Sequence, residues 1–409
     1  MRKFLGTAFF AIFALSLSAC STQPANEETT KAASEAQSTE AGSEAQSAQT
    51  GEGDMADAET FAIGSIGPIT GPAASYGTSV KQGSEIAIKE INEAGGVKVG
   101  DKTYKLELNF QDDEADPEMA VTAYNSLIDS KINVLLGCVT SGSSLAVVDL
   151  SSEDEILQIT PSGSAQAITE NPNVFRLCFT DPLQGKTIAK YVVDQGYESV
   201  AILYNNADEY STGVYEAFKE ELEAAGKGDL IVATESFVTE DVDYSSQLTK
   251  IKATGAKAIF VPGYYAAAAF ITQQARANGI ESDFIGSDGW DGVIAQVTDT
   301  SVLEGAVFLS PFVASDKAEN VSKFVEAYQA AYNSIPDQFA ADGYDTVYVI
   351  KAAMEKAGTI NNADLINAMT QISVDGVTGK VSFDEDGEPK KEAKFVVIEN
   401  GEYMFKDLN

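Results

Sequence analysis

Residues 61–96 read FAIGSIGPITGPAASYGTSVKQGSEIAIKEINEAGG and contain an expected strand, a glycine-rich turn and an expected helix in succession. The strand is expected at 61–66, where apolar residues follow one another as they do in parallel strands covered on both faces. The helix is expected at 78–94, because apolar residues recur on one face and Gly95-Gly96 ends the pattern. A strand followed by such a helix predicts an α/β fold with a parallel sheet.

The same alternation recurs twice along the chain, over 61–160 and again over 199–309. Further strands are expected at Lys105–Phe110, Ile132–Gly137, Ile156–Thr160, Val200–Tyr204, Leu230–Phe237, Ala258–Val261 and Gly305–Leu309. Further helices are expected at 117–130, 212–225, 266–278 and 317–332, followed by helical segments and a short terminal strand region. This pattern predicts two α/β lobes, each built on a doubly wound parallel sheet.

Composition excludes several classes of function. The 409 residues include 62 acidic and 27 basic ones, with a formal charge of −35, which argues against nucleic-acid binding. The chain has no histidine, so it contains neither Ser-His-Asp or Cys-His nucleophile pairs nor histidine-bearing zinc sites. We therefore expect no enzymatic activity and no cofactor. Cys138 and Cys178 lie in apolar runs and are expected to be two buried thiols, although one disulfide between them is the alternative.

Two acidic segments are candidates for metal binding. Asp112-Asp113-Glu114 with Asp116 is either an acidic metal patch or a solvated loop, and we favour the loop. Asp384-Glu385-Asp386-Gly387 resembles a calcium loop but lacks its twelfth-position carboxylate, so a hairpin turn is expected there. No metal site is predicted.

The N-terminus has the pattern of an export signal. Met1-Arg2-Lys3 is basic, residues 4–15 are almost wholly apolar, and small residues precede Cys20. Leu17-Ser18-Ala19-Cys20 resembles the bacterial lipobox, which implies removal of residues 1–19 and a lipid on Cys20; an ordinary signal peptide is the alternative. Residues 20–58 are rich in small and polar residues and are expected to be a disordered linker. The protein is expected outside the cytoplasm, held at the membrane by Cys20.

Polar turns follow several of the expected strands, where ligands bind in open α/β sheets. In the first half these are the Gly-rich turn 67–77 with Tyr76, then Thr140-Ser141-Gly142-Ser143-Ser144, then Pro161-Ser162-Gly163-Ser164. The second half contributes Asp208-Glu209-Tyr210, Gly263-Tyr264-Tyr265 and the 286–291 turn with Asp288. Hydroxyl and N–H donors in one half suit a carboxylate, and Asp288 with tyrosines in the other suits an ammonium group. The turns therefore predict a site for a zwitterion.

These turns, in this order, resemble the branched-chain amino-acid binding proteins of bacterial ABC importers, which have the type I periplasmic-binding fold. The likeness covers residues 60–400. The matching stretches are Gly71-Pro72-(x)3-Tyr76-Gly77, Gly83-(x)2-Ile86-Ala87, Ile91-Asn92-(x)2-Gly95-Gly96, Asp112-Asp113-(x)2-Asp116-Pro117, Ile159-Thr160-Pro161, Gln274-Ala275-Arg276 and Gly286-Ser287-Asp288-Gly289. The resemblance implies ligand contacts at Tyr76, Ser141, Ser162, Gly163, Ser164, Tyr210, Tyr264, Asp288 and Phe339.

The same resemblance implies the organisation and role of the chain. Lobe 1 is expected to comprise 59–179 plus 311–390 and lobe 2 to comprise 180–310 plus 391–409, joined by a three-strand hinge. Such a protein captures an amino acid, with leucine, isoleucine and valine favoured, between its lobes and delivers it as a monomer to an ABC permease. A receptor for urea, short amides or another small acid on the same scaffold is the alternative, and a signalling role stays open. Asp288 stands where some relatives have glutamate, which leaves the preferred side chain open.

Overall fold

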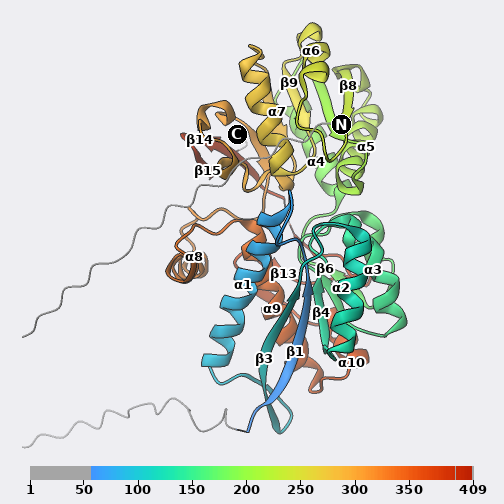
Figure 1. Cartoon of the computed structure of the whole chain (residues 1–409), viewed down its shortest axis with the longest axis vertical. Coiled ribbons are helices and arrows are strands. Elements are labelled where there is room, and N and C mark those ends of the chain that lie inside the picture. Colours follow the sequence, from blue (N-terminus) through green and yellow to red (C-terminus); the bar gives the residue numbers. More distant parts are fainter. Residues whose placement is uncertain (1–56, 392, 408–409) are drawn as a thin grey trace, which may run out of the picture. The chain divides into compact units, whose positions relative to one another are not determined.

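The structure is a computed structural model that describes residues 57–391 and 393–407. The predicted signal segment, Cys20 and most of the linker lie outside these residues. Two sheets of six and seven strands form the framework of the described chain, and a small two-stranded hairpin accompanies the first (Figure 1). We call each large sheet with the helices that pack around it a lobe.

The first lobe is built on the sheet β2-β3-β1-β4-β5-β6, which is parallel except for the edge strand β2. Its strands are β1 (Glu59–Ile66), β2 (Val97–Val99), β3 (Lys102–Gln111), β4 (Val134–Gly137), β5 (Gln158–Thr160) and β6 (Val174–Arg176). With it pack α1 (Ala74–Glu93), α2 (Pro117–Asp129), α3 (Ser141–Glu153), α8 (Glu319–Tyr332), α9 (Gln338–Ala357) and α10 (Asn362–Met369). The hairpin of β12 (Val374–Gly376) and β13 (Gly379–Val381) lies beside α9.

The second lobe is built on the sheet β15-β14-β11-β10-β9-β7-β8, in which neighbouring strands are parallel except for the pairs β11-β14 and β14-β15. Its strands are β7 (Val200–Asn205), β8 (Ile231–Phe237), β9 (Ala258–Val261), β10 (Asp283–Gly286), β11 (Val307–Leu309), β14 (Phe395–Glu399) and β15 (Glu402–Phe405). Its longer helices are α4 (Asp181–Asp194), α5 (Glu209–Ala224), α6 (Ser245–Thr254) and α7 (Tyr265–Ala277).

The parallel strands of both lobes have the same order. They run β3-β1-β4-β5-β6 in the first lobe and β8-β7-β9-β10-β11 in the second. Numbered along the chain, each set has the doubly wound order 2-1-3-4-5, which confirms the predicted fold class. In this order the chain reverses direction across the sheet between β1 and β4 and between β7 and β9. Ligand crevices of such sheets open beyond the carboxyl ends of the strands at those switch points.

Three passages connect the lobes. The chain leaves the first sheet after β6, returns after β11 and crosses again between β13 and β14. On the first passage, Asp181-Pro182 opens helix α4. The Thr180 hydroxyl accepts a hydrogen bond from the Leu183 N–H, and proline is well placed in a first helical turn, so the local sequence favours a helix there.

Helix positions follow local signals, with one shift of four residues. Helix α1 starts at Ala74 rather than at residue 78, which places Tyr76 in its first turn. Helix α9 packs along α1 with close backbone contact: a Cβ on Gly83 would lie 1.9 Å from the Ala340 carbonyl oxygen. Only glycine permits this approach, so Gly83 sets the distance between the two helices.

Cys138 and Cys178 are free and buried, which confirms the expectation of two buried thiols. Within residues 57–391 and 393–407, every helix is too short or too polar to cross a membrane. The 384–387 segment is a hairpin turn, as predicted: the Gly387 N–H donates to the Asp384 carbonyl and Gly387 has a φ of +78°.

Candidate functional site

A cavity lies between the lobes, beyond the carboxyl ends of their parallel strands. The empty space between its walls, counted together with the part open to solvent, is about 260 Å³. Segments that follow β1, β4 and β5 form one wall, and segments that follow β7, β9 and β10 form the other. Its lining residues are Tyr76, Val139, Thr140, Ser141, Ser162, Ser164, Tyr210, Tyr264, Asp288, Gly289 and Phe339. The cavity therefore occupies the switch points of both sheets.

Eight of the nine ligand contacts predicted from the sequence line this cavity. They are Tyr76, Ser141, Ser162, Ser164, Tyr210, Tyr264, Asp288 and Phe339. Gly163 is the exception and lies behind the wall, where a Cβ would come within 2.6 Å of the Ser144 hydroxyl and 2.7 Å of the Thr160 hydroxyl. The fold thus brings together residues that are up to 263 positions apart, from Tyr76 to Phe339.

Ser141 is the polar centre of the first-lobe wall. It is the first residue of α3, and its Oγ accepts hydrogen bonds from the Ser164 and Ala165 N–H groups, at 3.0 and 3.1 Å. A hydroxyl has two lone pairs and one hydrogen, so after accepting twice it can only donate. The N-terminus of α3 adds unpaired N–H groups and a partial positive charge. This wall is therefore suited to bind an anion.

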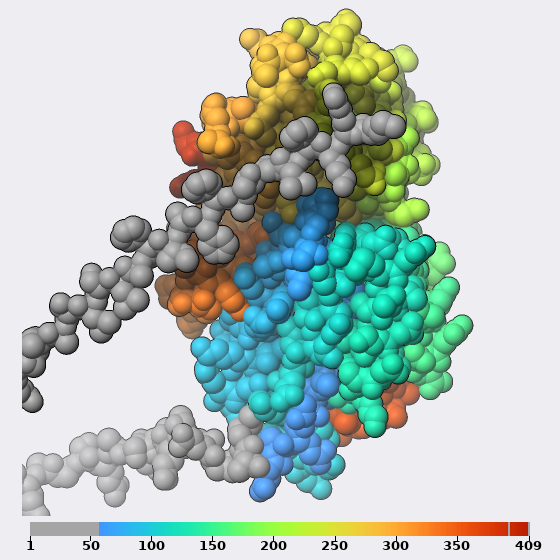
Figure 2. Space-filling model, viewed as in Figure 1, coloured from blue at the N-terminus to red at the C-terminus, as the bar shows by residue number. Residues whose placement is uncertain are grey.

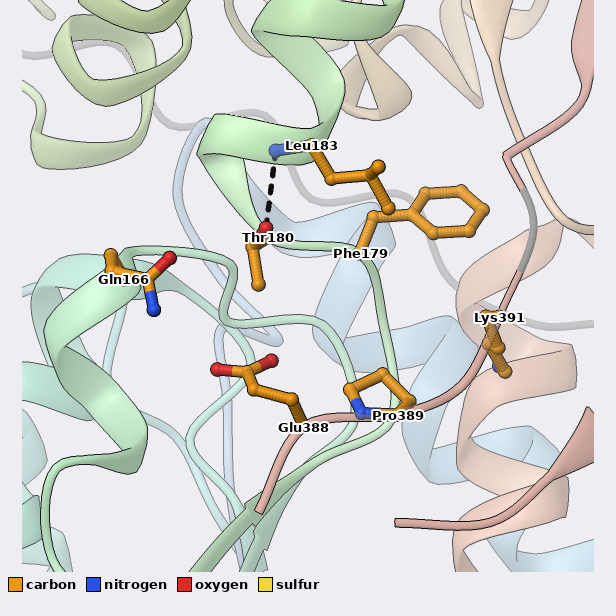
Figure 3. Close-up of a pocket in the computed structure, with 7 residues that line it drawn as sticks. All are labelled: Gln166, Phe179, Thr180, Leu183, Glu388, Pro389 and Lys391. Atoms are coloured by element: carbon orange, nitrogen blue, oxygen red, sulfur yellow. Dashed lines mark hydrogen bonds between the residues drawn. The ribbon is translucent and has the colours of Figure 1, made fainter. Parts of the chain in front are cut away.

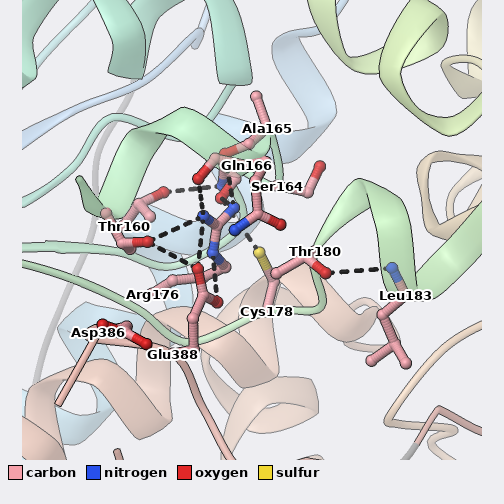
Figure 4. A network of polar contacts seen from close by, with 12 residues as sticks. Thr160, Ser164, Ala165, Gln166, Arg176, Cys178, Thr180, Leu183, Asp386 and Glu388 are labelled. Atoms are coloured by element: carbon pink, nitrogen blue, oxygen red, sulfur yellow. Dashed lines mark hydrogen bonds and ion pairs between the residues drawn. The ribbon is translucent and has the colours of Figure 1, made fainter. Parts of the chain in front are cut away.

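Arg176 supports that wall from behind, as Figure 4 shows. Its guanidinium is fully buried and donates to the Gly163 carbonyl at 3.1 Å and to the Ala165 carbonyl at 3.0 Å. It also forms two hydrogen bonds, each 3.0 Å long, with the Glu388 carboxylate on the passage from β13 to β14. Arg176 thus ties the turn that holds Ser141 to a connection between the lobes.

Asp288 is the polar centre of the second-lobe wall. It begins the 3-10 helix Asp288–Trp290 after β10 and is 6% exposed. The Tyr210 hydroxyl lies 2.6 Å from its Oδ1. Burial raises its pKa to about 6, although the Tyr210 hydroxyl and the Gly289 N–H stabilise the charged form. The groups that stabilise this charge are neutral donors, so the site lacks a compensating cation and favours one from a ligand.

Two further buried carboxyl groups lie on the second-lobe side of the site. Asp208 is the N-cap of α5, and burial raises its pKa to about 6 while the Ser211 N–H stabilises its charge. Burial raises the pKa of Asp181 well above its ordinary value, and the negative charge of Asp288 adds to this effect. A positive ligand group near Asp288 would favour the charged form of these carboxyl groups.

Aromatic side chains enclose the space between the two polar walls. Tyr210 and Tyr264 are stacked, with ring centroids 5.2 Å apart and planes 8° apart. Tyr76 contacts Tyr264 at 5.3 Å and Phe339 at 4.2 Å between centroids. Such rings provide a large apolar surface with defined geometry, which suits an apolar ligand side chain.

Hydrogen bonds join the lobes around the cavity. The Tyr76 hydroxyl of α1 donates to the Gly289 carbonyl and accepts from the Tyr265 N–H at 3.1 Å. The Gln338 side chain of α9 donates to the Asp288 carbonyl, and the Gln338 N–H donates to the Asp291 carboxylate at 2.8 Å. In Figure 2 the blue-to-cyan part of the first lobe and the yellow-green part of the second abut. The structure is therefore a closed form of the two lobes.

Three lining residues and one supporting residue were not predicted as ligand contacts. Val139, Thr140 and Gly289 line the cavity, and Gln338 holds the Asp288 backbone. Thr140 and Gly289 lie beside predicted residues in turns that the sequence had marked. Val139 and Gln338 have no distinguishing local signal, because an apolar residue after a strand and a polar residue opening a helix are common.

A second, larger cavity lies beside the passages between the lobes (Figure 3). Its empty space, counted together with the part open to solvent, is about 630 Å³, and it is lined by Gln166, Phe179, Thr180, Leu183, Glu388, Pro389 and Lys391. Its polar groups already serve the protein: Thr180 caps α4, Glu388 binds Arg176, and Lys391 donates to the Thr378 hydroxyl at 2.6 Å. The smaller cavity is the better candidate, because the Ser141 hydroxyl keeps its hydrogen to donate and the groups that stabilise the Asp288 charge most are neutral.

The acidic segment 112–116 has structural roles. Asp112 accepts from the Ile69 N–H at 2.9 Å and from the Thr70 hydroxyl, and Asp116 caps α2. In the part of the chain that the structure describes, no three acidic or cysteine side chains are placed to hold a metal ion. The hydrogen bonds of Asp112 and Asp116 organise a loop, although Asp113 is fully buried rather than solvated.

Residues 60–402 match the family model described as periplasmic binding protein. The Leu/Ile/Val-binding protein BraC3 of Rhizobium johnstonii is 30% identical over 331 residues, covering 80% of this chain and 88% of its own. The leucine-, isoleucine-, valine-, threonine-, and alanine-binding protein of Pseudomonas aeruginosa is 27% identical, covering 81% and 88%. The substrate binding protein LivJ of Streptococcus pneumoniae, solved with isoleucine, is 32% identical with a TM-score of 0.78, covering 85% and 100%.

These similar proteins are substrate-binding proteins, not enzymes, which confirms the prediction that this chain is not an enzyme. They also confirm the resemblance drawn from the dispersed turns.

Proposed function

Because the chain belongs to the periplasmic binding protein family, we propose that it binds a branched-chain amino acid between its lobes and delivers it to an ABC importer. One observation carries this proposal: Asp288 is a buried carboxylate without a cationic partner among the groups that set its pKa, opposite the donor Ser141. The ammonium group of a zwitterion neutralises Asp288, and its carboxylate accepts a hydrogen bond from Ser141.

The ligand-binding roles follow from this placement. The ligand carboxylate binds Ser141 and the N-terminus of α3, with Ser162 and Ser164 beside it. The ammonium group binds Asp288, which Tyr210 holds in place at 2.6 Å. The side chain packs among Tyr76, Tyr264 and Phe339. Gly163 acts through its carbonyl, which Arg176 and the Cys178 thiol hold at 3.1 and 3.4 Å.

The choice of leucine, isoleucine or valine rests on the relatives. BraC3 is a Leu/Ile/Val-binding protein, and LivJ was solved with isoleucine. The aromatic enclosure of the cavity supports an apolar side chain. Asp288 argues against urea and short amides, because an uncharged ligand leaves a buried carboxylate unpaired.

We propose that capture involves closure of the lobes about the three passages between them. The lobes would comprise 59–179 plus 311–390 and 180–310 plus 391–409. The bonds of Tyr76 and Gln338 to the Asp288–Trp290 segment exist only when the lobes meet, so they stabilise the closed form. A ligand that bridges Ser141 and Asp288 adds to the same stabilisation.

The family implies a location outside the cytoplasm. We propose that residues 1–19 are a lipoprotein signal, that Cys20 carries the lipid and that 20–58 link it to the binding module. The protein would then act as a monomer tethered to the membrane. Metabolic labelling with a fatty acid tests the anchor: the label should be incorporated into the wild-type protein and lost in Cys20→Ser, and equal labelling of both would contradict it.

Calorimetric titration of the residue 57–409 module with the twenty amino acids, urea, short amides and benzoate tests the binding function. We expect leucine, isoleucine or valine to bind with a Kd below about 100 μM, or about −5.5 kcal/mol. Binding of urea or an amide without any α-amino acid would favour the alternative receptor. Absence of binding by every α-amino acid would contradict the proposal.

A further inference from the structure

Thr140 has an unusual position on the first-lobe wall. It immediately precedes α3, where a threonine hydroxyl ordinarily accepts a hydrogen bond from an N–H of the first turn. Here its side chain makes no such capping bond. The residue is 6% exposed and lines the cavity beside Ser141. Within the described part of the chain, its Oγ1 has no hydrogen-bond partner.

This arrangement is unfavourable without a ligand. A buried hydroxyl without a partner has lost its hydrogen bonds to water and gained none in exchange. The same hydroxyl, turned toward α3, would cap the helix and pair one of its free N–H groups. The side chain instead lines the cavity, so a ligand group is the partner that its position favours.

The surrounding chemistry identifies that ligand group. The Ser141 hydroxyl accepts two N–H groups and therefore donates its own hydrogen. The first N–H groups of α3 are further donors with a partial positive charge. A nearby carboxylate, Asp113, is fully buried and is not among the lining residues. Donors on the same wall as Thr140 call for an acceptor that carries negative charge.

We propose that Thr140 is a further ligand-binding residue, which donates its hydroxyl hydrogen to the carboxylate of the bound amino acid. This inference rests on the proposed function. The carboxylate is common to all α-amino acids. Thr140 therefore contributes to affinity for the whole class of ligand and leaves the choice among side chains to the aromatic wall.

Thr140→Val tests this role, because valine keeps the shape of threonine and removes the hydroxyl. Titrations of wild type and variant should use several α-amino acids, and thermal unfolding of the ligand-free proteins should be measured in parallel. We expect every α-amino acid to bind about 10- to 50-fold more weakly to the variant, by the same factor, as for loss of a hydrogen bond to a charged group. The Tm of the ligand-free variant should be unchanged or higher, since an unpaired hydroxyl is removed.

Thr272→Val is the matched control. Thr272 is fully buried, and its hydroxyl is paired with the Ala268 carbonyl at 2.8 Å within α7, away from the cavity lining. Its affinities should equal those of the wild type, and its Tm should fall. This control separates loss of a buried hydroxyl in general from loss of the one at the cavity.

Three results would overturn the role of Thr140. Affinities equal to the wild type would show that the hydroxyl does not contact the ligand. Weakening confined to ligands with hydroxyl side chains would show that Thr140 reads the side chain. A lower Tm with unchanged affinity would show a helix cap. If the wild type itself bound no α-amino acid, the proposed function would be overturned as well. This outcome is distinguishable from the other three, because in those the wild type binds its ligand.

Discussion

Replacement of Asp288 by asparagine tests the electrostatic basis of the site. Asparagine keeps the size of the side chain and an oxygen that can accept from the Tyr210 hydroxyl, now at 2.6 Å from Oδ1, but removes the charge. At pH 7.5 the ligand ammonium would lose its ionised partner. We expect an affinity loss of about 2–4 kcal/mol, as for truncation of one member of a buried charge pair.

The magnitude of the pH effect follows from the raised pKa. Burial sets the pKa of Asp288 at about 6, so about nine-tenths of the carboxyl is protonated at pH 5 and almost none at pH 7.5. Only the ionised form pairs with the ammonium group. The Kd of the wild type should therefore rise about tenfold, or about 1.4 kcal/mol, between pH 7.5 and pH 5. Asp288→Asn should lose this dependence, apart from any share due to Asp208, whose pKa is also about 6.

The stability of the ligand-free protein should fall as the pH rises, whereas its affinity for the ligand should increase. The folded pKa of about 6 lies above the ordinary value of 3.8, so the folded state binds more protons and becomes less stable as the pH rises through 6. The shift of about two pKa units corresponds to a cost of up to about 3 kcal/mol above pH 6. Asp288→Asn removes this cost, and the ligand-free variant should therefore unfold at a higher urea concentration than the wild type at pH 7.5.

Calorimetric titration at pH 5, 6 and 7.5, with urea unfolding at the same pH values, measures both effects. Asp208→Asn is the control that shows how much of any remaining pH dependence of the Kd is due to Asp208. A wild-type Kd that stays constant from pH 7.5 to 5, or an Asp288→Asn variant that binds as tightly as the wild type, would refute the reasoning.

Two further predictions concern stability. Glu388→Gln leaves the Arg176 guanidinium buried without its charged partner and should lower the free energy of unfolding by about 3–5 kcal/mol in urea titrations. Glu319→Gln, which breaks an exposed ion pair, should leave the free energy of unfolding almost unchanged, and equal losses for both variants would contradict the assignment. Gly83→Ala places a Cβ 1.9 Å from the Ala340 oxygen and should cost about 1–3 kcal/mol or more through displacement of α9. An unchanged Tm would contradict the close packing of α1 and α9.

Local sequence signals were sufficient for the main elements and for most of the cavity wall. The apolar runs at β1, β4, β7 and β9 were predicted as strands, because each is long enough to show its pattern. The turns after them were predicted as ligand contacts, since the carboxyl ends of parallel strands meet at one edge. Asp116-Pro117 marked the start of α2 through its capping side chain.

Two short edge strands of the first sheet were not predicted. Strands β2 and β6 have three residues each, and pairing with β3 and β5 makes them strands. The position of Tyr76 was predicted at the mouth of a turn, and the structure places it in the first turn of α1.

The amino-acid sequence by itself determined the α/β class, the two lobes and the residue types that surround the cavity, because hydrophobic period and turn chemistry are local properties. Tertiary structure alone decided which polar groups remain available. The Ser141 hydroxyl can only donate, because the Ser164 and Ala165 N–H groups donate to it. The Thr140 hydroxyl has no hydrogen-bond partner among the described residues, and Arg176 pairs with a carboxylate 212 positions away. Residues that are neighbours in space pair with some of the hydrogen-bond donors and acceptors of the site. The sequence therefore predicted which groups form the site, but not which of their donors and acceptors stay available to a ligand.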